Sequence, residues 1–528
     1  MRDFFRPGRS PVLCRKAAIA TSHPLATAAG LEILAQGGNA VDAAIAAVAV
    51  QSVVDPLMTG IGGDCFALYA PANGEAVALN GSGRAPKAAT VARLTDLGLT
   101  EIPQTSPHAV TVPGAVSAWT KLHARFGSLP LELLFARAVS YAEDGFAVTP
   151  RVAWDWERNA PLIGADEGGR ALFLKNGRPP RAGETWAQPK LGARLREIAR
   201  DGARAFYLGA TAESLVRRLN ALGGLHTLED FADGMDAAEF VAPISAPYRG
   251  FEVVECPPNG QGVAALMILR LLEGFDLGAG VSAADRIHLH AEATKLAYLH
   301  RDALVGDPAT SGNAVAAMLA DDHVAALRRR IDPGHARPPV LWDEPEHKDT
   351  VYLCAVDADG NAVSFINSIF HGFGSTRADP GTGILLHSRG SSFRLIEGHP
   401  NAIAPRKRPL HTIIPGLLRR NGRTVMPFGV MGGHYQAAGH AAFLSGVLDR
   451  GLDVQAAIDA PRSFAFNSVL EVEPAVDEAT RAELARRGHA VAVAKLPIGG
   501  GQAIARDPGT GVLWCGSDPR KDGCALGF

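Results

Sequence analysis

Thr350 stands at the boundary between two different kinds of chain. Residues 337–348 are rich in proline and charge and lack an apolar period, which is typical of an exposed, irregular connector. Residues 350–357 then read as a β-strand that turns at Asp359-Gly360-Asn361 and returns over residues 362–368. A threonine that opens a strand is common, because its branched side chain suits strands. Its position alone therefore does not predict a catalytic role.

The chemistry open to Thr350 is nevertheless specific. A threonine hydroxyl is a weak nucleophile until a base removes its proton. A threonine at a chain terminus carries such a base itself, because its free α-amino group has a pKa of about 8. Cleavage between Asp349 and Thr350, at the end of the connector, would create this terminus.

The composition restricts the class of protein. The chain has 528 residues, 47% hydrophobic and 20% charged, which is typical of a globular enzyme with a large core. A net charge of -2 and a pI of about 6.8 predict neither a nucleic-acid nor a membrane partner. The longest apolar run, residues 40–54, is shorter than the roughly 20 residues of a spanning helix and predicts a buried helix.

The expected location is cytoplasmic. No apolar stretch of signal-peptide length follows the first residues. The six cysteines form no CxxC pair and no dense framework, so we expect reduced thiols.

The elements that would position Thr350 are antiparallel strands packed under helices, an α+β fold. A helix over residues 24–36 should end at Gly37-Gly38, and Asn39 should cap the next helix. The middle, about residues 115–330, reads as mostly helical, for example over 191–200, 212–222 and 284–303. Helices are also expected over 439–448 and 478–487. Hairpin turns are expected at residues 73–74, 359–361, 421–422 and 509–511.

Several separate motifs resemble those of the gamma-glutamyltransferases (glutathione hydrolases) and their acylase relatives. They cover nearly the whole chain in the family's order, so chance agreement is not a reasonable explanation. The motifs are Gly37-Gly38-Asn39-Ala40-Val41-Asp42-Ala43-Ala44, Thr59-Gly60-Ile61-Gly62-Gly63-Asp64, Thr111-Val112-Pro113-Gly114, Pro257-Pro258-Asn259-Gly260-Gln261-Gly262, Asp349-Thr350, Asp359-Gly360-Asn361-Ala362-Val363, Phe373-Gly374-Ser375, Gly381-Thr382-Gly383-Ile384-Leu385-Leu386, Lys407-Arg408-Pro409 and Gly432-Gly433.

The resemblance implies a four-layer αββα sandwich of the N-terminal nucleophile hydrolase type. It implies self-cleavage into a large subunit, residues 1–349, and a small subunit, residues 350–528, which remain together as a heterodimer or a dimer of heterodimers. The family's nucleophile falls on Thr350, and a second hydroxyl that bonds it falls on Ser368, where the family usually has threonine. The oxyanion hole falls on the backbone N–H groups of Gly432 and Gly433, although a plain strand-to-helix turn would also explain these glycines.

The substrate pocket departs from the family pattern. The family binds an α-ammonium with asparagine, glutamine and aspartate, and the matching positions here are Phe370, Arg389 and Ser392. None of these offers a carboxylate, so a buried ammonium would be costly. The family's serine pair becomes His411-Thr412.

The carboxylate-binding arginine of the family also moves. The matching position is Ser82, but Arg84 lies two residues later. Arg84 or Arg389 would suit a substrate that has a carboxylate and no ammonium. Glu397 or Asp64 could instead replace the missing aspartate.

The sequence thus predicts a self-processing amidohydrolase that transfers an acyl group from a small, anionic amide to Thr350 and then to water or an amine. Oxamate-type or glutaryl-amide hydrolysis without γ-glutamyl specificity is the first alternative, and an uncleaved, non-catalytic binding protein of the same fold is the second. A third alternative is a conventional serine hydrolase, in which a serine and a histidine would form the catalytic pair.

The remaining patterns predict no cofactor. The histidines show no paired metal spacing, and His288 and His290 read as packing or surface residues of a helix. His300-Arg301-Asp302 copies a kinase triplet but lies in the same helical stretch.

Overall fold

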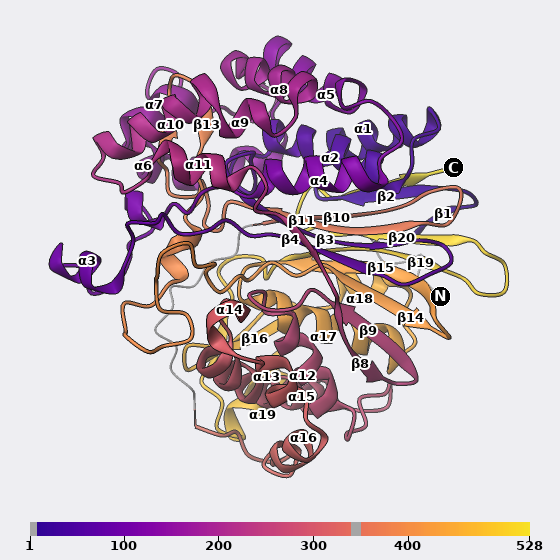
Figure 1. Cartoon of the computed structure of the whole chain (residues 1–528). Helices are drawn as coiled ribbons and strands as arrows, with labels where there is room; N and C mark the ends of the chain where they lie inside the picture. Colours follow the sequence, from indigo (N-terminus) through magenta and orange to yellow (C-terminus); the bar gives the residue numbers. More distant parts are fainter. Residues whose placement is uncertain (1–7, 339–349) are drawn as a thin grey trace.

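The computed structural model describes residues 8–338 and 350–528, so the predicted cleavage site at Asp349 lies outside the described residues. Two seven-stranded sheets form the centre of the molecule (Figure 1). The first sheet has the order β21 (Cys524–Gly527), β2 (Ala18–Thr21), β10 (Val351–Val356), β11 (Ala362–Ser368), β3 (Asp64–Ala70), β4 (Val77–Gly81), β7 (Glu239–Val241). The second has the order β1 (Val12–Cys14), β20 (Leu513–Ser517), β19 (Gly500–Arg506), β15 (Arg423–Met431), β14 (Gly416–Arg420), β9 (Phe251–Glu255), β8 (Ile244–Tyr248).

Helices cover the outer face of each sheet, which confirms the predicted four-layer αββα sandwich (Figure 1). The helices over the first sheet are α1 (Pro24–Ala35), α2 (Ala40–Val54), α4 (Ala115–Phe126), α5 (Leu131–Asp144), α6 (Pro150–Gly164), α7 (Glu167–Phe173), α8 (Pro189–Asp201), α9 (Arg204–Tyr207), α10 (Gly209–Ala221) and α11 (Leu228–Gly234). Those over the second are α12 (Gly262–Leu272), α13 (Ala283–Leu304), α15 (Ala314–Leu319), α16 (Asp321–Arg328), α17 (Tyr435–Leu448) and α18 (Val454–Asp459).

Smaller elements complete the chain. They are the helices α3 (Val91–Asp96), α14 (Pro308–Ser311) and α19 (Glu478–Arg486), the 3₁₀ turns η1 (Pro107–Ala109) and η2 (Arg389–Ser392), and the strands β5 (Phe146–Ala147), β6 (Thr185–Trp186), β12 (Ala378–Asp379), β13 (Ile384–Leu385), β16 (Ser463–Phe466), β17 (Val469–Val472) and β18 (Val491–Val493). Among the described residues, every helix is too short or too polar to cross a bilayer.

Local sequence signals explain the main elements. Asn39 caps α2 by accepting hydrogen bonds from the N–H groups of Val41 and Asp42, and every residue of α2 is buried, as predicted for this apolar run. The β14–β15 hairpin turns at Asn421 and Gly422, both with φ between 50° and 80° (53° and 76°), which a two-residue type I′ turn requires.

The prediction of a mostly helical middle did not include its five strands, of which β5 and β6 have two residues each. β7, β8 and β9 lie within residues 239–255, and β8 forms an edge of the second sheet. β8 contains Pro247, which an edge strand tolerates because its N–H side need not be paired. Each sheet therefore contains strands from before and after Thr350, so the two predicted subunits, residues 1–349 and 350–528, share both sheets.

Candidate active site

The β10–β11 hairpin brings Thr350 and Ser368 together. The strands are antiparallel with Val351 opposite Asn367, so the next pair outward is Thr350 and Ser368. Their hydroxyl oxygens are 3.1 Å apart, and both residues are buried. Tight hairpin register thus places a second hydroxyl beside the predicted nucleophile.

Phe370 continues this set of contacts. Its backbone N–H donates to the Ser368 hydroxyl at 2.9 Å. Its φ of 78° is a left-handed conformation that a bulky side chain rarely adopts, so the surrounding structure holds it there at some cost in energy. The guanidinium carbon of Arg389 lies 3.6 Å from the centre of the Phe370 ring, a cation–π contact.

Arg389 is a buried cation, with 1% of the residue exposed. It begins η2, and its Nη2 donates to the Thr412 hydroxyl at 3.1 Å. The Ser392 hydroxyl donates to the carbonyls of Arg389 (3.0 Å) and Leu410 (2.9 Å), so Ser392 holds the turn that carries the arginine. One connected group of residues therefore contacts Ser368, which in turn contacts Thr350. Its members are Phe370, Arg389, Ser392 and Thr412.

Asp64 lies opposite Ser368 on β3 and is completely buried. One carboxylate oxygen accepts from the N–H groups of Gly83 (2.9 Å) and Gly114 (3.0 Å), and the other lies 3.0 Å from Nε2 of His411. Burial raises the pKa of Asp64, but His387, His411 and Arg389 outweigh it and lower the pKa to about 2. Asp64 is thus an ionised group fixed in place, and turning it toward a substrate would break these bonds.

Glu397, the other residue that could replace the missing aspartate, is exposed.

Arg84 belongs to a separate group of charges. Its side chain is 35% exposed and lies 3.6 Å from the carboxylate of Asp307 and 3.9 Å from that of Glu239, and it donates to the carbonyl of Arg406 at 3.0 Å. Of the two arginines considered for a substrate carboxylate, the structure joins Arg389 to the Thr350 group.

Gly432 and Gly433 follow β15 and precede α17. Their φ angles of 133° and 59° favour glycine, and a Cβ on Gly432 would lie 2.9 Å from the Cα of Gly499. Across the two sheets, the Ser364 hydroxyl donates to the carbonyl of Phe428, and the ring of Tyr352 packs against Gly429. From these contacts, the N-terminal end of β10 leads to Thr350, and the C-terminal end of β15, on the same side, leads to Gly432 and Gly433. Their role as oxyanion donors stays a prediction.

A buried polar network supports the glycine loop. Nε2 of Gln261 donates to the carbonyls of Gly433 (3.1 Å) and Thr412 (2.8 Å). Oε1 of Gln261 accepts from Nη1 of Arg301 at 2.9 Å, and this nitrogen also lies 3.0 Å from Nδ1 of His434. The Tyr298 hydroxyl bonds the carbonyl of His434. Gln261 therefore links the Gly433 loop to the Thr412 loop.

Sequence reasoning did not assign these supporting residues. Gln261 lies in the family motif at residues 257–262, which itself implies no role for it, and Arg301 lies in the His300-Arg301-Asp302 triplet of a helix. Gln261 bonds Gly433 across 172 residues of chain and Arg301 contacts His434 across 133, so spacing alone gives no signal.

The fold and this arrangement define the class of protein: an N-terminal nucleophile hydrolase sandwich in which a buried threonine begins a central strand. The family model described as Gamma-glutamyltranspeptidase matches residues 26–528. The chain belongs to the gamma-glutamyltranspeptidase family, whose members are hydrolases and acyltransferases.

Individual relatives match over nearly their full length. The chain is 36% identical to the glutathione hydrolase-like YwrD proenzyme of Bacillus subtilis (strain 168), covering 98% of this chain and 99% of the relative. It is 35% identical to the oxamate amidohydrolase proenzyme of Klebsiella pneumoniae, over 96% and 97%. The crystal structure of cephalosporin acylase from Bacillus halodurans is 40% identical, with a TM-score of 0.93 over 100% of this chain and 98% of that one.

Proposed function

We propose that the protein is a self-processing amidohydrolase with Thr350 as its nucleophile. The contact between the Thr350 and Ser368 hydroxyls, at 3.1 Å, carries this proposal. The Thr350 hydroxyl attacks the carbonyl of Asp349, the peptide C–N bond breaks, and the resulting ester is opened by water. Thr350 then has a free α-amino group, which serves as the general base for later cycles.

In turnover, the Thr350 oxygen attacks the substrate amide carbonyl and the amine leaves with a proton. Water or an acceptor amine then opens the acyl-enzyme ester. The N–H groups of Gly432 and Gly433 stabilise the oxyanion of each tetrahedral intermediate. Because both sheets contain strands from either side of Thr350, the fragments stay together as a heterodimer.

For the substrate, we infer a small amide whose acyl part carries a carboxylate and no α-ammonium. The contacts from Thr350 through Ser368 and Phe370 to Arg389 support this class, because they connect a buried cation to the residues around the nucleophile. Asp64 is held by His411 and two backbone N–H groups, so it does not serve as an ammonium ligand. The names of the oxamate amidohydrolase and cephalosporin acylase relatives are compatible with non-γ-glutamyl amides.

Denaturing electrophoresis with N-terminal sequencing tests the processing. The wild-type chain should give two fragments, and the smaller should begin at Thr350. Thr350→Ala should remain one chain without activity, whereas Thr350→Ser should retain slow cleavage because serine keeps the hydroxyl. A smaller fragment that begins at another residue would refute the assignment, and an intact wild-type chain would favour the non-catalytic binding protein.

Hydrolysis of γ-glutamyl anilide, glutaryl anilide and oxamate, compared on one preparation, tests the substrate class. The glutaryl or oxamate amide should be cleaved faster, because an α-ammonium would lie unpaired against Arg389. Faster use of the γ-glutamyl compound would contradict the pocket assignment and leave the nucleophile assignment intact.

A further inference from the structure

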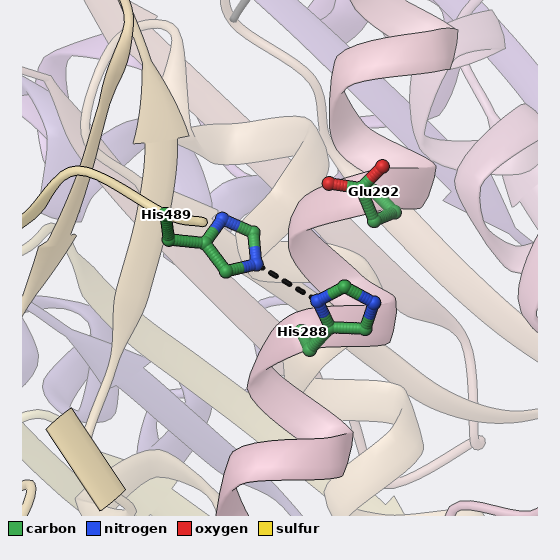
Figure 2. Close-up of side chains that lie close together, drawn as sticks. All are labelled: His288, Glu292 and His489. Atoms are coloured by element: carbon green, nitrogen blue, oxygen red, sulfur yellow. Dashed lines mark hydrogen bonds between the residues drawn. The ribbon is translucent and has the colours of Figure 1, made fainter. Parts of the chain in front are cut away.

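Two histidines and a glutamate meet in the helical layer that covers the second sheet. His288 and Glu292 are one helical turn apart on α13, so their side chains project from the same face, and His489 approaches from the segment after α19 (Figure 2). All three residues are buried, and one ligand atom from each lies within 4.8 Å of the others. Nδ1 of His288 is 2.8 Å from Nε2 of His489.

The hydrogen bonds fix which histidine nitrogens can bind a cation. Nε2 of His288 lies 2.7 Å from the carbonyl oxygen of Asp332, which can only accept, so this nitrogen carries the proton. Nδ1 of a neutral His288 therefore presents its lone pair to His489. A carbonyl that orients a histidine in this way is the usual outer partner of a metal-binding imidazole.

In this arrangement Nε2 of His489 donates to Nδ1 of His288, so a bound ion would replace this proton, which would move to Nδ1 of His489 or to solvent. The present nitrogen–nitrogen distance would have to lengthen to about 3.3 Å for both rings to bind one tetrahedral ion at about 2.0–2.1 Å. This is a shift of about half an ångström.

The carboxylate supplies the negative charge. Oε1 of Glu292 lies 2.7 Å from Nζ of Lys295, and Oε2 accepts from the N–H of Arg337 at 3.1 Å. Each oxygen has a second lone pair. The positive charge of Lys295 repels a nearby divalent cation, so it should lower the affinity for the ion.

We propose that His288, Glu292 and His489 form a site for a divalent transition-metal ion of the zinc type. Two imidazoles and one carboxylate are a known zinc ligand set, with water as the fourth ligand. His288 and Glu292 precede Thr350 in the chain and His489 follows it. If the chain is cleaved as proposed above, the ion joins the two fragments.

The site would also anchor the start of the connector. The carbonyl of Asp332 bonds His288, the N–H of Arg337 bonds Glu292, and the N–H of Ala336 bonds the carbonyl of Arg487, two residues before His489. An ion that fixes His288 and Glu292 therefore fixes the backbone that bonds them.

Titration of the chelator-treated protein with Zn²⁺ by calorimetry tests the site. We expect one saturable ion per chain, and a rise in Tm because the ion binds only the folded state. Glu292→Gln, which keeps the size of the side chain, should weaken binding by about 10²-fold or more, and His489→Ala should do the same. Lys295→Gln should strengthen binding at least about tenfold, because a repelling charge is removed.

The part-buried pair His300 and His323 provides the control. Their ring centres are 4.8 Å apart, so His323→Gln tests for nonspecific binding to histidines and should leave the titration unchanged. Thr350→Ala should bind Zn²⁺ like the wild type, which separates this result from the outcome of cleavage. Absence of saturable binding, or binding that Glu292→Gln leaves unchanged, would overturn the proposal even if His489→Ala fails to fold.

Discussion

The hydroxyl of Ser368 contacts both the predicted nucleophile and the backbone that carries Phe370. It lies 3.1 Å from the Thr350 oxygen and accepts from the Phe370 N–H at 2.9 Å. Ser368→Ala should slow both processing and turnover by about 10²–10⁴-fold, because the assistance to the nucleophile is lost while the fold remains. The rate of fragment appearance and kcat are the measurements.

Ser368→Thr is the matched control, because it restores the residue that the family usually has and keeps the hydroxyl. It should retain most of the activity. If Ser368→Ala processes itself and turns over at the wild-type rate, Ser368 is only a strand residue.

Substitutions at Arg389 and at Arg84 should have different effects on substrate recognition. Arg389→Lys keeps the charge but loses the planar fork and the stacking on Phe370, so kcat/KM for an anionic amide should fall by about 10–10²-fold. Arg84→Ala should change it less than about twofold, because this part-exposed side chain pairs with Asp307 and Glu239. Steady-state kinetics on glutaryl anilide decide between them, and the reverse result would identify Arg84 as the carboxylate ligand.

At the scale of elements, the hairpins were the most predictable features. The strand over residues 362–368 was placed at its observed bounds, because alternation and the Asp359-Gly360-Asn361 turn define it locally. This placement is what puts Ser368 opposite Thr350. The strands β1, β2 and β8 were not predicted. β1 and β8 are short edge strands and β2 has only four residues, so each carries little pattern of its own.

The surroundings of the site depend on contacts that sequence spacing does not contain. Asp64 meets His411 across 347 residues of chain, and Gln261 meets Gly433 across 172. The sequence indicated Arg84 and Arg389 equally as carboxylate ligands. The structure shows Arg389 against Phe370 and Arg84 beside Asp307 and Glu239, and their roles stay predictions.

Gln261 permits a test at this scale, because it joins two loops. In Gln261→Glu the side chain still accepts from Arg301, but a carboxylate replaces the amide that donates to the carbonyls of Gly433 and Thr412. The loop that carries the predicted oxyanion donors should shift, so we expect kcat to fall by about 10–10³-fold with little change in KM.

Gln188 provides a matched control for Gln261. It is also buried, and its Nε2 donates to the backbone carbonyl of Val53 at 2.9 Å. Gln188→Glu should lower the stability without lowering kcat in the folded enzyme. Equal losses of kcat in both variants would show that Gln261 has a structural role only.

At the scale of the whole molecule, burial keeps many histidines neutral. The pKa of His23 is lowered to about 3 by burial, and burial with neighbouring cations lowers those of His371 and His411 to about 3. In the unfolded chain a histidine has a pKa of about 6.5. Between these values the unfolded chain binds protons that the folded chain does not, so stability must fall as the pH falls from about 6.5 toward 3.

His23 gives the clearest test, because burial alone lowers its pKa. It caps α1 through Nδ1, which accepts from the N–H of Leu25 at 3.2 Å, and asparagine can cap in the same way without titrating. On an uncleaved Thr350→Ala background, lowering the pH from 7 to 5 should cost His23→Asn about 2 kcal/mol less free energy of unfolding than its parent. Urea unfolding at both pH values measures this difference. An equal loss in His23→Asn and its parent would show that His23 is protonated in the folded protein.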